Sequence, residues 1–289
     1  MRTRPGSQCD DDRSVTEAGT DAGDGPRAVE VWWARAEDAH DGLVSLLDQV
    51  ERARYAATTD PASARRFLVG CAVSRLVLGG RLGLPAADVP LKRVCPRCGG
   101  PHGKVALDRD RTPPTADVRF SVTHGGDTVG VAFCHGAEVG LDVEEIAQFG
   151  SAGAGAVAGS NGDREGSARN VAVLAPRVLT ATELAALHDR PRADLPGAFL
   201  RYWVRKEAVL KAWGTGLHVP LRQLEVSAPE QHPEVVGWPE RDGLPHELSM
   251  ADTVVLGRHP AAVCVIGRGG VALRERDAGP ALRDVRPPR

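Results

Sequence analysis

The sequence predicts an α+β protein built from two similar α+β halves, related by a pseudo-twofold axis, with the active site in the cleft between them. Short strand-like segments alternate along the chain with amphipathic helical segments. A helix over 64–78 is followed by Val89-Pro-Leu91, and a helix over 199–213 is followed by Val219-Pro-Leu221. Two related halves would explain this repeat, and ligand sites commonly lie between such units. A chance likeness between short segments is the alternative.

The bulk composition describes an ordinary globular chain and excludes several classes of protein. The 289 residues carry a formal net charge of -2 and show no basic stripe interleaved with aromatic residues, so we expect no nucleic-acid partner. No apolar run approaches the roughly 20 residues of a membrane span. The acidic N-terminus does not resemble a signal segment, so we expect a cytoplasmic protein, and a monomer. Six cysteines in a chain of this length do not form a disulfide framework.

Composition also divides the chain into segments. The residues that lack apolar periodicity are 1–27, which we expect to be a disordered tail, and 271–289, a charged C-terminal tail. Between them we expect an N-terminal half over 28–136 and a C-terminal half over 137–270. Within the second half, 147–175 is rich in glycine, alanine and serine, and we expect a flexible insertion with no packed core.

The N-terminal half begins with a strand at 29–33, where apolar and other residues alternate. Helices are expected over 43–55 and over 64–78. The segments 118–124 and 128–134 then form strands around Gly125-Gly126-Asp127, a pattern typical of a hairpin. His124 lies at this turn, where an exposed turn residue is the ordinary interpretation.

A Cys-Pro-Arg-Cys sequence at 95–98, with His102 nearby, has two interpretations. Zinc favours such ligands, but a structural site wants four, and a second pair is missing. The other interpretation is a tight glycine- and proline-rich turn that presents Lys104.

The strand expected over 139–146 carries two acidic residues on one face. Its period of two places Leu141 and Val143 on one side and Asp142 and Glu144 on the other. The Cα atoms of the two acidic residues would lie about 6.5 Å apart, close enough for both carboxylates to reach one cation. A solvated acidic face is the alternative. Mg²⁺ is the natural ion for one or two carboxylates completed by substrate phosphates.

One amphipathic helix, over 201–217, dominates the C-terminal half and ends at glycines. Leu200, Val204, Glu207 and Lys211 share one stripe of this helix. Glu207 therefore continues a line of core residues, and we expect it to be partly desolvated. An ordinary i,i+4 ion pair on a solvated face is the alternative. The chain has only four lysines, and two of them lie in this helix, at 206 and 211.

The remaining elements flank this helix. Thr180 and Glu183 have capping-box spacing at the start of a preceding helix. Strands are expected at 224–226, 253–256 and 262–266.

Five motifs in order resemble the 4′-phosphopantetheinyl transferases of the Sfp type, over about residues 50–225. The motifs are Arg66 in Ala-Arg-Arg-Phe-Leu-Val-Gly, Gly103-Lys104, Phe120-Ser-Val-Thr-His124, Val139-Gly-Leu-Asp-Val-Glu144, and Trp203-Val-Arg-Lys-Glu-Ala-Val-Leu-Lys211 with Gly214-Thr-Gly-Leu217. The resemblance implies an enzyme that moves phosphopantetheine from coenzyme A to a serine of an acyl or peptidyl carrier protein and releases adenosine 3′,5′-bisphosphate. It also implies two similar halves, with coenzyme A and Mg²⁺ between them.

The resemblance assigns a role to each matching position. Asp142, Glu144 and Glu207 resemble the Mg²⁺ ligands, and Glu207 also resembles the base that takes the serine proton. Lys211 resembles the residue that meets the pyrophosphate and helps the leaving group depart. The positions that resemble the nucleotide and phosphate contacts are Arg66, Lys104, Thr123 and His124, with Lys206 beside them and Arg54 as a further candidate.

The departures from the family pattern concern nucleotide contacts and carrier docking. Val105 stands where proline is frequent, Thr123 where serine is commoner, and Ser121 where asparagine is frequent. The segment 147–175 replaces a region that in relatives is more ordered and helps to dock the carrier.

A non-catalytic coenzyme A- or carrier-binding relative is one alternative function, although all three carboxylates are present. A zinc-stabilised interaction module is the other. The class of carrier, whether fatty-acid, polyketide or nonribosomal-peptide, stays open.

Overall fold

The structure is a computed structural model that describes residues 25–94, 99–100, 103–113, 117–145, 161–214, 219–239 and 247–286, with only the backbone of 161–169. Nearly all of the expected N-terminal tail therefore lies outside the described residues. The same holds for Cys95, Cys98 and His102, so the zinc hypothesis stays a prediction.

The elements divide about the middle of the chain. The first part contains β1 (Arg27–Arg35), η1 (Ala36–Asp38), η2 (Asp41–Leu46), α1 (Gln49–Ala57), α2 (Pro61–Leu82), η3 (Ala86–Asp88), β2 (Leu91–Arg93), β3 (Val105–Leu107), η4 (Arg109–Arg111), β4 (Val118–Gly125) and β5 (Thr128–His135). The second part contains β6 (Val139–Val143), α3 (Asn161–Val178), α4 (Ala181–His188), α5 (Leu195–Trp213), η7 (Leu221–Gln223), β7 (Glu225–Val226), β8 (Val235–Gly237), β9 (Leu248–Val255), β10 (His259–Ile266), β11 (Val271–Asp277) and α6 (Gly279–Arg283).

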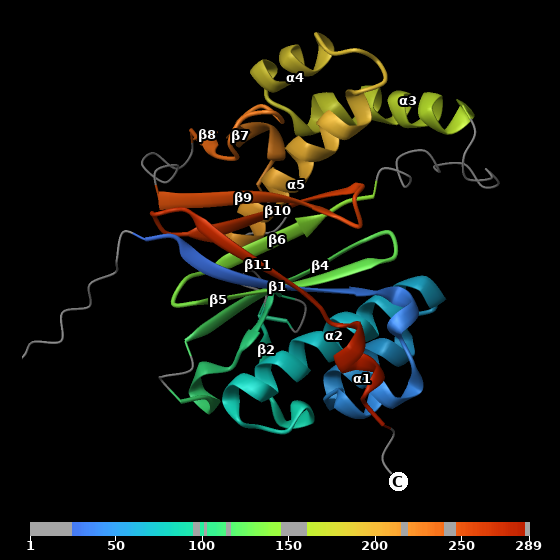
Figure 1. The fold of residues 1–289 in the computed structure, drawn as a ribbon, viewed down its shortest axis with the longest axis vertical. Helices are drawn as coiled ribbons and strands as arrows, with labels where there is room; N and C mark the ends of the chain where they lie inside the picture. The colour runs from blue at the N-terminus through green and yellow to red at the C-terminus, as the bar shows by residue number, and fades with distance from the viewer. Residues whose placement is uncertain are drawn as a thin grey trace, which may run out of the picture.

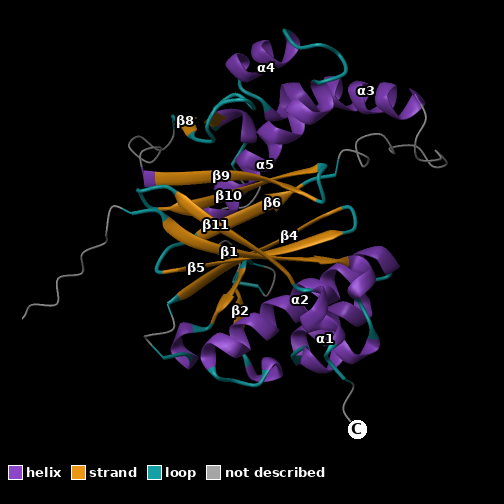
Figure 2. Ribbon diagram, in the orientation of Figure 1, coloured by secondary structure: helices purple, strands orange, loops and turns teal. Residues whose placement is uncertain are grey.

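Two sheets form the middle of the molecule, with helices outside each (Figures 1 and 2). One sheet has the order β11-β1-β5-β4 and the other β6-β10-β9. Strand β1 contributes Val29 and Val31 to the core between the sheets, and β6 contributes Val139 and Leu141 to the same core. Side chains on the opposite face of each strand pack toward the helices, α2 in the first part and α5 in the second. The α+β class is therefore confirmed.

The two sheets repeat one strand arrangement. In each, an initial strand pairs antiparallel with the second strand of a later hairpin, giving β1-β5-β4 and β6-β10-β9. A long helix precedes each hairpin and ends at a left-handed glycine, Gly83 at φ 65° and Gly214 at φ 79°. Glycine tolerates this conformation without steric cost. The second helix ends at Gly214 as expected, whereas the first continues past the expected end at 78, through Gly79 and Gly80, to Leu82.

A buried ion pair also occurs in both parts. Arg75 on α2 donates to the capping-box residue Glu51 of α1 at 2.5 Å and to backbone carbonyls that include Val89 O. Lys206 on α5 pairs with the capping-box residue Glu183 of α4 at 2.5 Å, and donates to Leu221 O at 3.0 Å. Each pair ties a long helix to the preceding helix and to the segment that follows it.

Three expectations require correction. The helix expected over 43–55 is divided, because Asp48 caps a new helix by accepting from Glu51 N. The segment 271–289 is not a plain tail: it contains β11, which pairs in parallel with β1, and α6. The end of the expected insertion 147–175 is packed: it forms part of α3, whose residues Val171 and Ala175 lie in the core and are 2% and 1% exposed.

In the part of the chain that the structure describes, no helix is both long and apolar enough to cross a bilayer.

Candidate active site

The close contact of α5 with β6 brings the predicted acidic and basic residues together. A Cβ atom on Gly140 would lie 1.9 Å from Ala208 O and 2.4 Å from Ala212 N, so only glycine allows the helix backbone this near the strand. The glycine within the strand is a sequence signal of such a backbone approach. Because Gly140 and Asp142 share the face of β6 toward α5, the approach also sets Asp142 under the helix.

Asp142, Thr123 and Lys211 form a hydrogen-bonded cluster between the two parts of the chain. The Nζ atom of Lys211 lies 2.6 Å from Asp142 Oδ1 and donates to Thr123 Oγ1 at 3.1 Å. The Thr123 hydroxyl donates to Asp142 Oδ1, also at 3.1 Å. Asp142 is 4% exposed, and desolvation raises its pKa while Lys211 opposes that shift. Strand β4 thus supplies the hydroxyl, β6 the carboxylate and α5 the ammonium group.

Glu207 and Glu144 extend this cluster with two further desolvated carboxyl groups. Burial, followed by repulsion from Asp142, raises the pKa of Glu207 to about 7. The same two causes, in the same order, raise the pKa of Glu144 to about 7. Glu207 is 8% exposed, in line with its expected place at the end of an apolar stripe. Carboxyl groups with such pKa values can accept protons near neutral pH.

The carboxyl groups of the acidic cluster are suited to bind a divalent cation, although they are not close enough together to form a ready metal site. Among the described residues, no three His, Cys, Asp or Glu side chains form a ready group of metal ligands. However, Asp142 Oδ2 and Glu207 Oε1 are both buried without a hydrogen-bond partner. Buried carboxylate oxygens normally have a partner, and a hard cation such as Mg²⁺ prefers oxygen ligands. The donor set therefore fits Mg²⁺.

Arg66 and His124 add positive charge beside the cluster. Arg66 on α2 donates to Gly126 O, in the turn after β4, at 3.3 Å. Desolvation, then the cations Arg66 and Lys211, lower the pKa of His124, which places both cations near its ring. The helix α2 and the β4–β5 turn thus face the acidic residues of α5 and β6 with cationic and imidazole groups.

Two predicted nucleotide residues lie apart from the cluster. Lys104 donates to Val139 O at the start of β6, three residues before Asp142 and thus about 10 Å from it along the strand. Lys206 is fully buried, and donates to Val178 O and Leu221 O as well as pairing with Glu183. The expected place of Lys206 beside the nucleotide contacts therefore needs correction, because neighbouring positions on a helix point about 100° apart.

Arg54, the further candidate, is exposed and lies over the ring of Phe67, with 4.9 Å from its guanidinium carbon to the ring centroid.

Two residues at the site were missed in the sequence. Trp203 hydrogen-bonds the Glu144 carboxylate and helps to hold it against α5. Glu145 packs over the β4–β5 turn, where a Cβ atom on Gly126 would fall 1.6 Å from Glu145 Oε2. Trp203 lies four residues before Glu207 in the helix, so its position on the same face could have been found from helical periodicity.

Three desolvated carboxyl groups, a lysine and flanking cations define an acid–base site suited to a phosphorylated substrate and a metal ion. The model of the family described as the 4′-phosphopantetheinyl transferase superfamily matches residues 138–264. This range includes β6, α5 and the whole acidic cluster.

Two curated proteins are similar to most of this chain. The 4′-phosphopantetheinyl transferase HetI of Nostoc sp. is 26% identical over 219 residues, which cover 74% of this chain and 81% of that protein. A phosphopantetheinyl transferase of Thraustochytrium sp. is 26% identical over 212 residues, covering 71% and 68% respectively. The family model over 138–264 and the two curated relatives agree: the chain is similar to the 4′-phosphopantetheinyl transferase superfamily, and its similarity to these two transferases supports the Sfp type.

Among solved structures, holo-acyl-carrier-protein synthase (AcpS) of Thermotoga maritima is 22% identical, covering 45% of this chain and 63% of that one, with a TM-score of 0.31. This likeness is too slight to bear on the fold.

The raised pKa values make metal binding depend on pH in a defined direction. Without metal, Glu144 and Glu207 hold protons up to about pH 7, whereas the unfolded chain releases them near the ordinary value of 4.5. Each group therefore destabilises the metal-free fold as pH rises from about 4.5 to 7. Mg²⁺ favours the deprotonated carboxylates, so its stabilising effect should be small at pH 6 and large at pH 8.

We expect the difference between the melting temperature measured in Mg²⁺ and that measured in EDTA to increase from pH 6 to pH 8. The apparent Mg²⁺ affinity should rise about tenfold or more, because at least one proton is released per ion. The double variant Glu144→Gln/Glu207→Gln should show neither trend. A wild-type difference that stays flat between pH 6 and pH 8 would contradict these pKa values.

Proposed function

We propose that this protein transfers the 4′-phosphopantetheine group from coenzyme A to a serine of an acyl or peptidyl carrier protein, and releases adenosine 3′,5′-bisphosphate. The observation that carries the proposal is the cluster of Asp142, Glu144, Glu207 and Lys211, contributed by β6, the residue that follows its end, and α5 within the segment matched to the superfamily. A non-catalytic relative would not need a base with a pKa near neutrality.

Each residue has a proposed part in this transfer. Glu207 accepts the proton of the carrier serine, since a hydroxyl is a weak nucleophile without a positioned base. Lys211 offsets the negative charge that grows on the departing phosphate, and Thr123 orients the ammonium group through their 3.1 Å hydrogen bond. Arg66 and His124 hold the nucleotide phosphates at the edge of the site.

Asp142, Glu144 and Glu207 would hold Mg²⁺, whose bound form would offset charge on the pyrophosphate oxygens. Lys104 is a candidate for a more distant part of coenzyme A rather than for the reacting phosphates, because it lies at the opposite end of β6. Desolvation lowers the pKa of its ammonium group, and Glu138 opposes that shift.

We also propose that the two parts of the chain are related by a pseudo-twofold axis, with the active site in the cleft between them. The repeated strand order, the repeated glycine-ended helices and the repeated buried ion pairs support this relation. The hydrogen bonds that join Thr123 on β4 to Asp142 on β6 and Lys211 on α5 support a site between the halves. We propose, in addition, that the protein is cytoplasmic and acts as a monomer.

The reaction is tested by mass spectrometry of several apo carrier proteins incubated with the enzyme, coenzyme A and Mg²⁺. At least one carrier should gain the mass of one phosphopantetheine group, and EDTA should abolish the gain. The panel should include fatty-acid, polyketide and nonribosomal-peptide carriers, because the site does not distinguish them. No gain on any carrier, with enzyme whose fold is confirmed, would refute the proposal.

A further inference from the structure

The first part of the chain has a position that corresponds to the metal-binding position of β6. The second hairpin strands, β5 and β10, are each eight residues long. Trp32 on β1 pairs with Val131, the fourth residue of β5, and Asp142 on β6 pairs with Ala262, the fourth residue of β10. Trp32 therefore stands in the first sheet where Asp142 stands in the second.

The two long helices correspond in the same way. Leu76 and Glu207 each lie seven residues before the glycine that ends the helix, at 83 and 214. Gly80 and Lys211 each lie three residues before it. The acid, base and ammonium groups of the active site are thus replaced in the first half by an indole, an isobutyl group and a hydrogen atom, and this position has no metal or acid–base chemistry.

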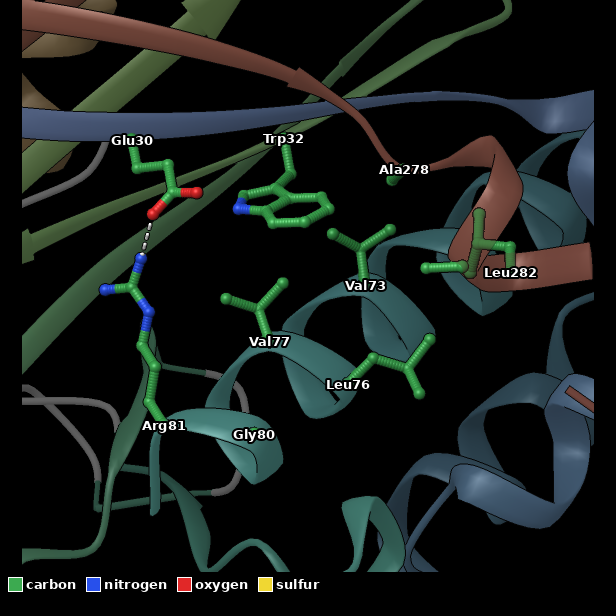
Figure 3. A pocket seen from close by; sticks show the side chains of 10 residues that line it. Glu30, Trp32, Val73, Leu76, Val77, Gly80, Arg81, Ala278 and Leu282 are labelled. Atoms are coloured by element: carbon green, nitrogen blue, oxygen red, sulfur yellow. Dashed lines mark hydrogen bonds and ion pairs between the residues drawn. The ribbon is translucent and has the colours of Figure 1, made fainter. Parts of the chain in front are cut away.

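These three replaced positions line one cavity of about 280 Å³ (Figure 3). Val73 and Val77 of α2 form its apolar floor, and Leu282 of α6 closes one end. The absence of a side chain at Gly80 leaves part of this space open, since a Cβ atom there would have no neighbour within 4 Å. The volume exceeds the roughly 150 Å³ of an apolar cavity that holds benzene.

Strand β11, in the C-terminal segment, replaces a contact that the active site makes between the two sheets. At the active site, Thr123 on β4 reaches across to Asp142. The corresponding residue of β9, Thr253, instead donates to Glu275 on β11, at 3.2 Å to either carboxylate oxygen. Strand β11 runs beside β1 and so occupies the space that faces the catalytic cluster in the other half.

One end of the pocket is polar and carries an unused hydrogen-bond donor. The Nε1 atom of Trp32 is buried without a partner. Figure 3 shows this nitrogen on the side of the ring toward the ion pair of Glu30 and Arg81, whose atoms lie 2.6 Å apart. Arg276, outside the lining of the pocket, reaches the same glutamate at 3.3 Å, so the Glu30 carboxylate is shared between two guanidinium groups.

We propose that this cavity binds an amphipathic monocarboxylate with a medium-length aliphatic chain. The chain would lie on the apolar floor between α2 and α6, and the carboxylate would accept from the Trp32 indole and lie near Arg81. The match rests on an apolar body, an unpaired buried donor and the Arg81 guanidinium group, whose paired carboxylate is shared with Arg276. Nothing in this site contributes to the transfer reaction proposed above, so it is a second binding site on the same chain.

Isothermal titration calorimetry with octanoate, octanol and octylamine tests the proposal. Each ligand is titrated into the intact protein with and without saturating coenzyme A. Octanoate should bind with a Kd at or below about 1 mM, a modest affinity for a ligand of its size, and saturating coenzyme A should not displace it. Octanol should bind about tenfold more weakly, and octylamine more weakly still, because the charged acceptor is missing or reversed. Equal affinities for octanoate and octanol, or displacement by coenzyme A, would overturn the proposal.

Two variants localise the binding. Gly80→Leu places a side chain in the cavity on a helix where glycine is unfavourable, so the fold should be retained and octanoate binding lost. The matched control is Gly197→Leu, another helical glycine with open space around its Cβ position, and it should bind octanoate normally. Trp32→Phe keeps an aromatic ring, removes the unused donor and should weaken octanoate about tenfold with little effect on octanol. Unchanged octanoate binding in both Gly80→Leu and Trp32→Phe would contradict the assigned location.

Discussion

Replacing Glu207 by glutamine should lower kcat by at least about 10²-fold, the low end of what general acid–base catalysis contributes. Glutamine has nearly the same size but cannot accept the serine proton, and it removes a negative charge from the proposed metal site. The fold should survive, because the substitution replaces a desolvated carboxyl group, with an unpaired buried Oε1, by a neutral amide. Steady-state kinetics across a Mg²⁺ titration should show weaker Mg²⁺ binding as well as slower turnover.

The matched variant on the same helix is Lys211→Met, which keeps the aliphatic stem and removes the charge. Its loss should appear mainly in kcat, since the proposed partner charge develops in the transition state. Its dependence on Mg²⁺ should stay closer to wild type than that of Glu207→Gln. Near-normal turnover of Glu207→Gln at saturating Mg²⁺ would show that another group takes the serine proton.

Sequence periodicity predicted which acidic and basic residues share a face, and the family resemblance supplied the other members of the candidate site, Arg66, Thr123 and His124. The stripe of α5 joined Glu207 to Lys211, and the period of two in the strand expected over 139–146 joined Asp142 to Glu144, which lies just after β6. Their meeting depends on a contact that periodicity does not describe, the crossing of α5 over Gly140. The ordered motifs therefore anticipated a cluster whose members lie up to 88 residues apart in the chain.

The elements that the sequence did not predict depend on partners far away in the chain. Strand β11 has the charged sequence Arg274-Glu-Arg-Asp277 and is largely exposed, but its backbone pairs with β1, more than 240 residues earlier. Its composition indicates solvent exposure, and cannot reveal this pairing. Val171 and Ala175 are likewise buried because α3 packs on α5, η7 and α4.

Lys206 illustrates the same limit at the level of one side chain. It lies next to Glu207 in the sequence, and the family resemblance places it beside the nucleotide contacts. Burial of a lysine requires compensating partners, and those partners are Glu183, capped into place by Thr180, and two backbone carbonyls. Because the partners lie 15 to 28 residues away, the helix alone does not distinguish the buried structural lysine from Lys211, the proposed catalytic one.

Replacing Lys206 by methionine should therefore destabilise the protein rather than weaken coenzyme A binding. The substitution leaves the Glu183 carboxylate buried without its cation, a change that commonly costs about 3–5 kcal/mol of unfolding free energy. In a protein of this size, such a loss lowers the melting temperature by roughly 10 °C. The fraction that stays folded should keep a KM for coenzyme A near the wild-type value, because Lys206 is fully buried and its partners are Glu183 and two backbone carbonyls rather than residues of the proposed site.

The double variant Lys206→Met/Glu183→Gln separates the two interpretations. Removing the stranded charge should recover part of the lost stability, since a neutral pair is less costly to bury than one unpaired carboxylate. Melting temperatures of the two single variants and the double variant, with KM for coenzyme A measured well below the lowest of them, complete the comparison. If Lys206→Met melts like wild type and raises the KM for coenzyme A severalfold, the lysine serves the nucleotide and the buried ion pair contributes little.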